Sequence, residues 1–203
     1  RTEWIDACHN NKTIELTDCK VNGEPLSGDI VGDYGNGNII ILDGNYFVKT
    51  PSSLLKVCQD VLSADSKNNV TIELGEDIDL SGVEWPAIKT SVAFVLDGKG
   101  KTIKNLTTSA VEEHGFSSTA MFSTTRKATT IKNLVIEGAE ITGKGGDNSH
   151  GAFLVACNYA ALTVSEVTVK NSTISNCDRT GGIVTYLYFN AATVENCVVE
   201  ECT

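Results

Sequence analysis

Ile131-Lys-Asn-Leu-Val-Ile136 is a six-residue phrase that recurs along the chain, with apolar residues at its first and fourth positions and, in most copies, at its sixth. The other copies are Val164-Ser-Glu-Val-Thr-Val169, Val194-Glu-Asn-Cys-Val-Val199 and the earlier Ile103-Lys-Asn-Leu-Thr-Thr108. In chain order, the copies start 28, 33 and 30 residues apart. A period in this range indicates stacked structural repeats, because one such unit cannot bury its apolar face without its neighbours.

Each repeat divides into three short segments rich in residues that favour β-strands. These segments are 164–169, 173–177 and 182–186 in one repeat, and 131–136, 140–142 and 152–156 in the preceding one. Apolar spacing of three and then two in the first segment departs from strict alternation and predicts a bend or bulge. Strands this short stack in parallel on the next coil more readily than they form hairpins. The predicted fold is therefore all-β, a right-handed single-stranded parallel β-helix (a pectate-lyase-like solenoid), with a β-sandwich of about seven strands as the alternative.

One amphipathic helix, at about residues 52–64, interrupts the β-rich pattern. Its apolar residues recur at helical spacing, at Leu54, Val57, Cys58, Val61 and Leu62. Thr50 or Ser52 can cap its start, and Pro51 suits its first turn. A single helix in a solenoid needs an apolar surface to cover, so we expect it to cap one end of the strand stack.

Residues 1–48 also contain repeat-like sequence. Leu16-Thr-Asp-Cys-Lys-Val21 fits the phrase, and Gly28-Asp-Ile-Val31 parallels Gly181-Gly-Ile-Val184. We predict that 1–48 form β-helix-like rungs, either the end of a preceding repeat or terminal coils in permuted order. Residues 49–203 would then form the capping helix and further coils of one continuous unit. Because the chain begins and ends inside a repeat, it also predicts end-to-end self-association.

Composition narrows the classes of partner. The formal charge of −10 argues against nucleic acid, whose phosphates are bound by clustered Lys and Arg. No run of eighteen apolar residues is present, so we expect no membrane-spanning segment.

The seven cysteines are spaced unlike a metal site or a disulfide framework. The sequence contains no Cys-x-x-Cys pair, and Cys197 stands where Val167 and Leu134 stand in other repeats. A free cysteine behaves as a small buried apolar residue. We therefore predict buried free thiols rather than disulfides or metal ligands.

Three strings carry a resemblance to a known family: Val70-Thr-Ile-Glu-Leu74, Glu76-Asp-Ile-Asp-Leu-Ser-Gly-Val-Glu-Trp-Pro86 and Leu96-Asp-Gly-Lys-Gly-Lys-Thr-Ile-Lys-Asn-Leu106. Together they resemble the opening of GLUG-type right-handed β-helix proteins, which are common on the surface of Bacteroides and related gut bacteria. The resemblance covers about Pro51 to Cys202. It implies an adhesin-like protein that is extracellular or on the cell surface, without a catalytic set. This chain departs from the family in placing repeat-like residues before the helix.

An enzyme is the rival interpretation, because β-helices also host polysaccharide lyases and glycoside hydrolases. Asp77, Asp79 and Glu84 are close in sequence and could supply a pair of catalytic carboxylates, but turn and edge positions explain them as well. The histidines His9, His114 and His150 are scattered and lack zinc-ligand spacing. We therefore expect no catalytic residues, no cofactor and no metal.

Tyr186 and Tyr188, with Asp178 and Arg179 nearby, form the candidate ligand site. Aromatic rings on a solenoid flank could stack on sugar rings while polar neighbours bind hydroxyl groups, so a glycan or a host or matrix surface is the expected partner. The alternative is that these tyrosines face inward as core, the role also expected of Trp4 and Trp85. The predicted function is a non-catalytic, adhesin-like and carbohydrate-binding module. The alternatives are a carbohydrate-active enzyme and a purely structural stalk.

Overall fold

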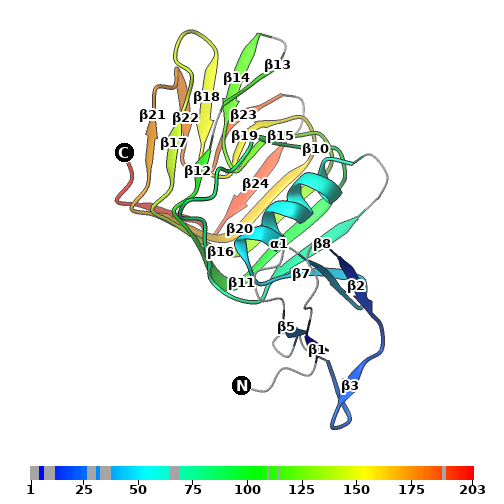
Figure 1. Cartoon of the computed structure of the whole chain (residues 1–203). Helices are drawn as coiled ribbons and strands as arrows, with labels where there is room; N and C mark the ends of the chain where they lie inside the picture. The colour runs from blue at the N-terminus through cyan, green and yellow to red at the C-terminus, as the bar shows by residue number, and fades with distance from the viewer. Residues whose placement is uncertain are drawn as a thin grey trace.

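The computed structural model describes residues 5–6, 12–26, 31–32, 38–64, 69–108, 110–113, 115–188 and 191–203 (Figure 1). Short strands stack coil upon coil to form a parallel β-solenoid with one short helix. This arrangement confirms the predicted parallel β-helix. Four successive segments form each complete coil, and every coil-to-coil pair of equivalent strands is parallel in the described residues.

The largest sheet of the described chain has ten strands. Its strands are β2 (Thr13–Leu16), β6 (Ile39–Leu42), β7 (Asn45–Val48), β8 (Val70–Leu74), β9 (Ile78–Asp79), β11 (Phe94–Lys104), β16 (Thr129–Glu137), β20 (Leu162–Lys170), β24 (Ala192–Glu195) and β25 (Val198–Glu200). From β8 onward, its inward side chains line the main core.

Three smaller sheets complete the coils. One contains β12 (Thr107–Thr108), β17 (Glu140–Thr142) and β21 (Thr173–Ser175). The second contains β13 (Val111–Glu113), β14 (Phe116–Thr119), β18 (Ser149–Ala152) and β22 (Arg179–Gly181). The third contains β10 (Ile88–Thr90), β15 (Phe122–Thr125), β19 (Val155–Asn158) and β23 (Val184–Leu187).

The prediction for the third segment of each repeat is wrong in one respect. The structure forms two strands there, where the sequence predicted one. The predicted segment 152–156 spans the end of β18 and the start of β19, with Phe153 and Leu154 between them. Both of these side chains are buried in the main core. Burying two successive large side chains requires the chain to turn a corner there, which period-two alternation does not reveal.

The predicted bend in the repeated phrase is confirmed, at its third residue. Asn133 and Glu166 have φ of 52° and 55° in the middle of β16 and β20, and Asn196 has φ of 53° between β24 and β25. This left-handed conformation reverses the inward and outward alternation, and asparagine tolerates it better than most residues.

The earliest copy of the phrase does not stack on the others. Leu96, not Ile103, pairs with Ile131, and Ile103 pairs with Ile136 at the phrase's end. Asn105 has φ of 55° and its backbone N–H donates to Glu137 O. The copy therefore resembles the phrase because both sites need a left-handed residue followed by an inward leucine.

The helix begins where the sequence predicts. Thr50 caps it by accepting a hydrogen bond from Ser53 N at 3.2 Å, and Ser53 Oγ accepts one from Thr50 N. It comprises α1 (Pro51–Lys56) and a π-helical continuation, η2 (Val57–Leu62). The five predicted apolar residues are all buried. They pack in the main core with residues of β8, β9 and β10, so the helix covers the first coil.

Residues 38–48 extend the large sheet beyond the first coil. β7 pairs in parallel with β8, while β6 and β7 form an antiparallel hairpin. β2 pairs in parallel with β6. Two small pairs lie outside this sheet, β1 (Ile5–Asp6) with β5 (Val31–Gly32), and β3 (Lys20–Val21) with β4 (Glu24–Pro25). The origin of 1–48 in a preceding or permuted repeat stays a prediction.

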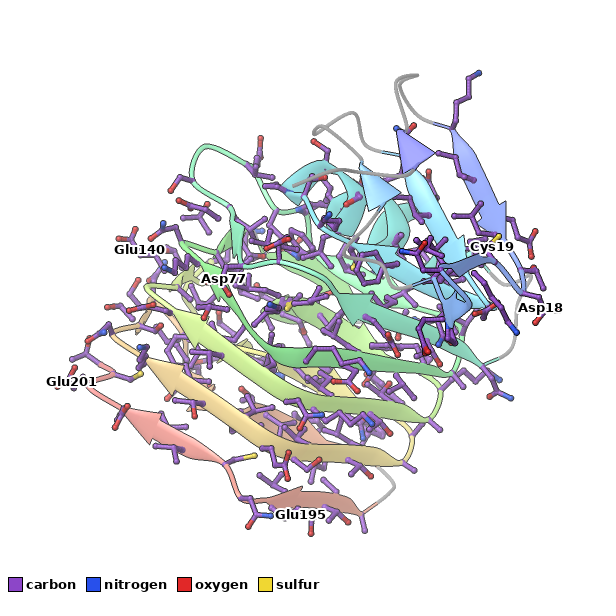
Figure 2. The ribbon with its side chains drawn as sticks, turned by 90° about the horizontal axis from the view of Figure 1, so that it is seen from below. Asp18, Cys19, Asp77, Glu140, Glu195 and Glu201 are labelled. Carbon is purple, nitrogen blue, oxygen red and sulfur yellow. The ribbon has the colours of Figure 1, made fainter. Side chains whose placement is uncertain are left out.

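The two ends of the stack differ. Figure 2 shows Glu195 and Glu201 on the last coil, away from Asp18 and Cys19 beside the N-terminal strands. Val194, Val198 and Val199 on the last coil are 45–46% exposed. The predicted end-to-end association stays a prediction.

The described cysteines are all free, as predicted. Cys58 and Cys157 are buried, and burial raises the pKa of the Cys58 thiol far above its ordinary value. The other four described cysteines, Cys19, Cys177, Cys197 and Cys202, are partly exposed, so the prediction of burial holds only for two. Trp85 is buried and donates its indole N–H to Met121 O at 2.9 Å, as expected for a core residue, whereas Trp4 lies outside the described residues.

Val169→Ala tests the stacked core, because Val169 is fully buried in the column that joins Ile136 to Val199. We expect the substitution to lower the free energy of unfolding by about 2 kcal/mol, from lost burial and a residual cavity. Val199→Ala is the matched control, since Val199 is 45% exposed in the same column. It should lower that free energy by less than about 1 kcal/mol. Equal losses in urea denaturation would contradict the stacking order.

Candidate functional site

The four predicted site residues lie together on the last complete coil. Asp178 and Arg179 stand at the start of β22, and Tyr186 and Tyr188 lie in β23 and just after it. Arg179 Nε is 3.7 Å from Asp178 Oδ2, and both side chains are about half exposed. Tyr188 is 41% exposed and Tyr186 is half-buried.

The two tyrosines belong to a set of five rings that we call the aromatic row. Its members, in spatial order, are Phe116, His150, Tyr186, Tyr188 and Tyr159. Neighbouring ring centroids are 5.4, 5.1, 5.6 and 4.9 Å apart in that order. The His150 and Tyr186 rings are stacked at an interplanar angle of 10°, and those of Tyr159 and Tyr188 at 25°. Figure 1 shows the strands that carry the row, β14, β18 and β23, in the upper part of the view, away from β2 and β7.

The structure does not support the alternative in which Tyr186 and Tyr188 are core residues. The main core takes Ile183 and, in part, Val184 from this segment, and neither tyrosine belongs to it. Both rings instead pack against other rings on the flank of the solenoid. Phe189, next in the chain, lies outside the described residues.

Sequence reasoning missed three members of the row. Phe116, His150 and Tyr159 come from earlier coils. They precede Tyr186 in the sequence by 27 to 70 residues. His150 is paired in register with Ser118 on one side and Arg179 on the other. Only the register of the strands brings these positions together. A signal existed for two of them: His150 occupies the place of Arg179 in its repeat, and Tyr159 follows Asn158 as Tyr188 follows its partner Leu187.

His150 is the buried member of the row. Its Nδ1 is 3.3 Å from Cys157 Sγ, which in turn lies 3.2 Å from Ser118 Oγ. Among the described residues, its Nε2 has no hydrogen-bond partner. Burial lowers the pKa of His150, the positive charge of Arg179 lowers it further, and Asp178 partly opposes this. The balance of these effects favours the neutral form of the imidazole.

The Cys157–His150 contact resembles a nucleophile beside a base, but its surroundings do not suit that chemistry. Cys157 is 4% exposed, and His150 is fully buried beneath the rings of Phe116 and Tyr186. A reactive cysteine needs access and a neighbour that stabilises its thiolate, whereas a histidine with a lowered pKa resists becoming the imidazolium. We therefore assign this contact to packing.

Two of the three carboxylates weighed for catalysis, Asp77 and Asp79, hold the first coil together, whereas Glu84 is exposed. Asp77 Oδ1 accepts a hydrogen bond from Thr102 N at 2.8 Å. Asp79 Oδ1 accepts from Asn105 Nδ2 at 2.8 Å, from Ser81 Oγ at 2.7 Å and from Ser81 N at 2.9 Å. These bonds, that of Asn105 first, lower the pKa of Asp79 to about 2. Each carboxylate thus fixes a turn against the next coil.

The part of the chain that the structure describes offers neither a cluster of metal ligands nor a membrane-spanning helix. No group of three or more His, Cys, Asp or Glu side chains in it could hold a metal ion. His9 and His114 lie outside the described residues. None of its helices is both long and apolar enough to span a bilayer.

Comparison with known proteins yields one structural likeness. A solved structure described as a putative immunoglobulin A1 protease from Bacteroides ovatus is similar to this chain, with a TM-score of 0.44 and 18% sequence identity. The match covers 76% of this chain and 56% of that one. A scan of protein-family models and a search of curated proteins found no match. The resemblance to GLUG-type proteins therefore stays a prediction.

His150→Phe tests the neutral, buried histidine. A lowered pKa means that the unfolded chain binds a proton more readily than the folded one, so stability falls as the pH drops below about 6.5. We expect the wild type to lose more stability than His150→Phe in urea denaturation between about pH 7.5 and about pH 5.5. The other titrating groups are common to both proteins. The same loss in both would contradict burial of the neutral imidazole.

Proposed function

We propose that this protein is a non-catalytic binding module, secreted or displayed at the cell surface, and that its aromatic row binds carbohydrate. The observation that carries the proposal is the exposed end of the row, where Tyr188 stacks on Tyr159 at 4.9 Å and contacts Tyr186 at 5.6 Å. Exposed aromatic clusters on a soluble surface are a mark of binding sites.

The chemistry of the flank suits a sugar. The apolar C–H face of a pyranose ring packs against the face of a tyrosine, while the phenol group remains available for a hydrogen bond. Asp178 and Arg179 lie on the adjoining strand, and their exposed side chains can accept from and donate to hydroxyl groups. The strands hold these groups in register, so little freedom is lost when a ligand binds.

Export and adhesion rest on the resemblance to GLUG-type surface proteins. The assignment as non-catalytic rests on the burial of Cys157 and His150 and on the structural roles of Asp77 and Asp79.

A glycan array with the soluble chain tests the proposal, with Tyr188→Ala as the informative variant. We expect binding to one class of glycan, and a roughly tenfold loss of affinity when the ring is removed. Leu187→Ala is the matched control, because Leu187 is 42% exposed, adjoins Tyr188 in the chain and carries no ring. It should bind as the wild type does.

Three outcomes would refute the proposal. Absence of binding to any glycan would remove the function. Equal effects of Tyr188→Ala and Leu187→Ala would remove the aromatic row as its site. Release of shorter saccharides from a bound glycan would show an enzyme instead.

A further inference from the structure

A second concave site lies between the N-terminal hairpin and the first coils, on elements that contribute nothing to the aromatic row. It is a cavity of about 390 Å³. Its walls come from β6–β7, β8 and β11, and its lining residues are Leu26, Leu42, Asp43, Asn45, Phe47, Glu73, Leu74, Gly75, Lys99 and Lys101. Cavities of this size at the junction of two packed units are typical of small-molecule sites.

A bulge in β11 shapes the charged wall of this cavity. β11 uses residues 98–100 where β16 uses only Asn133, so the register shifts between Asp97 and Lys101. The bulge requires glycine, because a side chain at Gly98 would lie 2.3 Å from Asn133 O and Gly100 has φ of 75°. Bulges re-aim side chains and are frequent beside binding sites. Here the bulge brings Lys99 and Lys101 to the cavity.

The two lysines differ in their electrostatic partners. Lys99 Nζ lies 3.2 Å from Glu73 Oε1 and 3.6 Å from Asp97 Oδ2. The ion pairs found among the described residues do not include Lys101, which is half-buried. The other acid of the wall, Asp43, accepts a hydrogen bond from Asp18 N. The Lys101 ammonium therefore has no carboxylate partner among the described residues, although the chain as a whole carries a negative net charge.

The opposite wall is apolar and closely packed. Phe47, Leu42 and Leu26 pack together in a small core separate from the main one. The Phe47 ring lies so close to Gly75 that a methyl group there would be 2.2 Å from its Cζ. Asn45 and Asp43, at the tip of the hairpin, add an amide and a carboxylate beside this wall.

We propose that this cavity binds a monosaccharide that carries a carboxylate. The carboxylate pairs with Lys101, where burial strengthens a charge-assisted hydrogen bond. The apolar face of the sugar ring lies against the wall formed by Phe47 and Leu42, and its hydroxyl groups bond to Asn45 and Asp43. Uronic acids and sialic acid share this chemistry. The proposal does not depend on the aromatic row.

Isothermal titration calorimetry with the full chain tests the site with four probes: D-glucuronate, N-acetylneuraminate, neutral D-glucose and inorganic sulfate. We expect at least one acidic sugar to bind, and glucose and sulfate each to bind at least about tenfold more weakly. Binding of D-glucuronate would identify a uronic acid as the ligand, and binding of N-acetylneuraminate would identify a sialic acid. Added salt should weaken the binding, since a charge pair in a half-buried site is still partly screened.

Lys101→Gln removes the charge and keeps most of the side chain, so it should lower the affinity for the acidic sugar by about tenfold. Lys104→Gln is the matched control, because Lys104 lies on the same strand and does not line the cavity. It should leave the affinity unchanged, as should Tyr188→Ala, which separates this site from the aromatic row. Urea denaturation of each variant confirms that it is folded.

Four results would overturn the proposal. They are absence of binding by both acidic sugars, equal affinity for glucuronate and glucose, sulfate binding as tightly as the acidic sugars, and equal losses in Lys101→Gln and Lys104→Gln. Loss of acidic-sugar binding in Tyr188→Ala but not in Lys101→Gln would also overturn it, by placing the ligand on the aromatic row.

Discussion

The structure depends on the stacking of each interior side chain on its equivalent one coil away. Ile103, Ile136, Val169 and Val199 form one such column, linked by parallel pairing at each step. No single coil could bury these residues, because each coil contributes only one layer of strands and needs its neighbours to cover it. The helix covers the column's first coil, and the valines of the last coil are correspondingly exposed. Stability and shape therefore follow from neighbour contacts along the axis.

Left-handed residues at the corners keep this stack in register. Asn105, Gly138 and Asn171 turn the chain out of the large sheet in successive coils, with φ between 51° and 66°. Their backbone groups join one coil to the next, as Asn105 N does to Glu137 O. Because every coil turns at the same place, outward side chains also fall into columns. Ser118, His150 and Arg179 form such a column, and through it the repeat creates a surface that no repeat contains alone.

Both candidate sites arise where the chain departs from the repeat. The aromatic row includes Phe116 from the β13–β14 hairpin, an antiparallel addition to parallel coils. The cavity depends on the β11 bulge and on the β6–β7 hairpin, neither of which recurs in later coils of the described chain. The regular coils supply rigidity, and the irregular segments supply side chains of distinct chemistry. The row presents aromatic faces and the cavity presents a cation, so the two surfaces suit different parts of a glycan.

The sequence by itself determined the architecture, because apolar periodicity and the demand to bury it are local properties of the chain. It placed the helix, a bend within the phrase and the core role of Trp85, and the structure located that bend at the third residue. Only the tertiary structure decided that the third segment is two strands, that Ile103 pairs with Ile136, and that His150 stacks on Tyr186. The cavity beside Lys101 was likewise invisible, since its walls come from separate segments at residues 26, 42–47, 73–75 and 99–101. Register across coils sets such contacts, and one residue of slip, which changes no local pattern, would remove them.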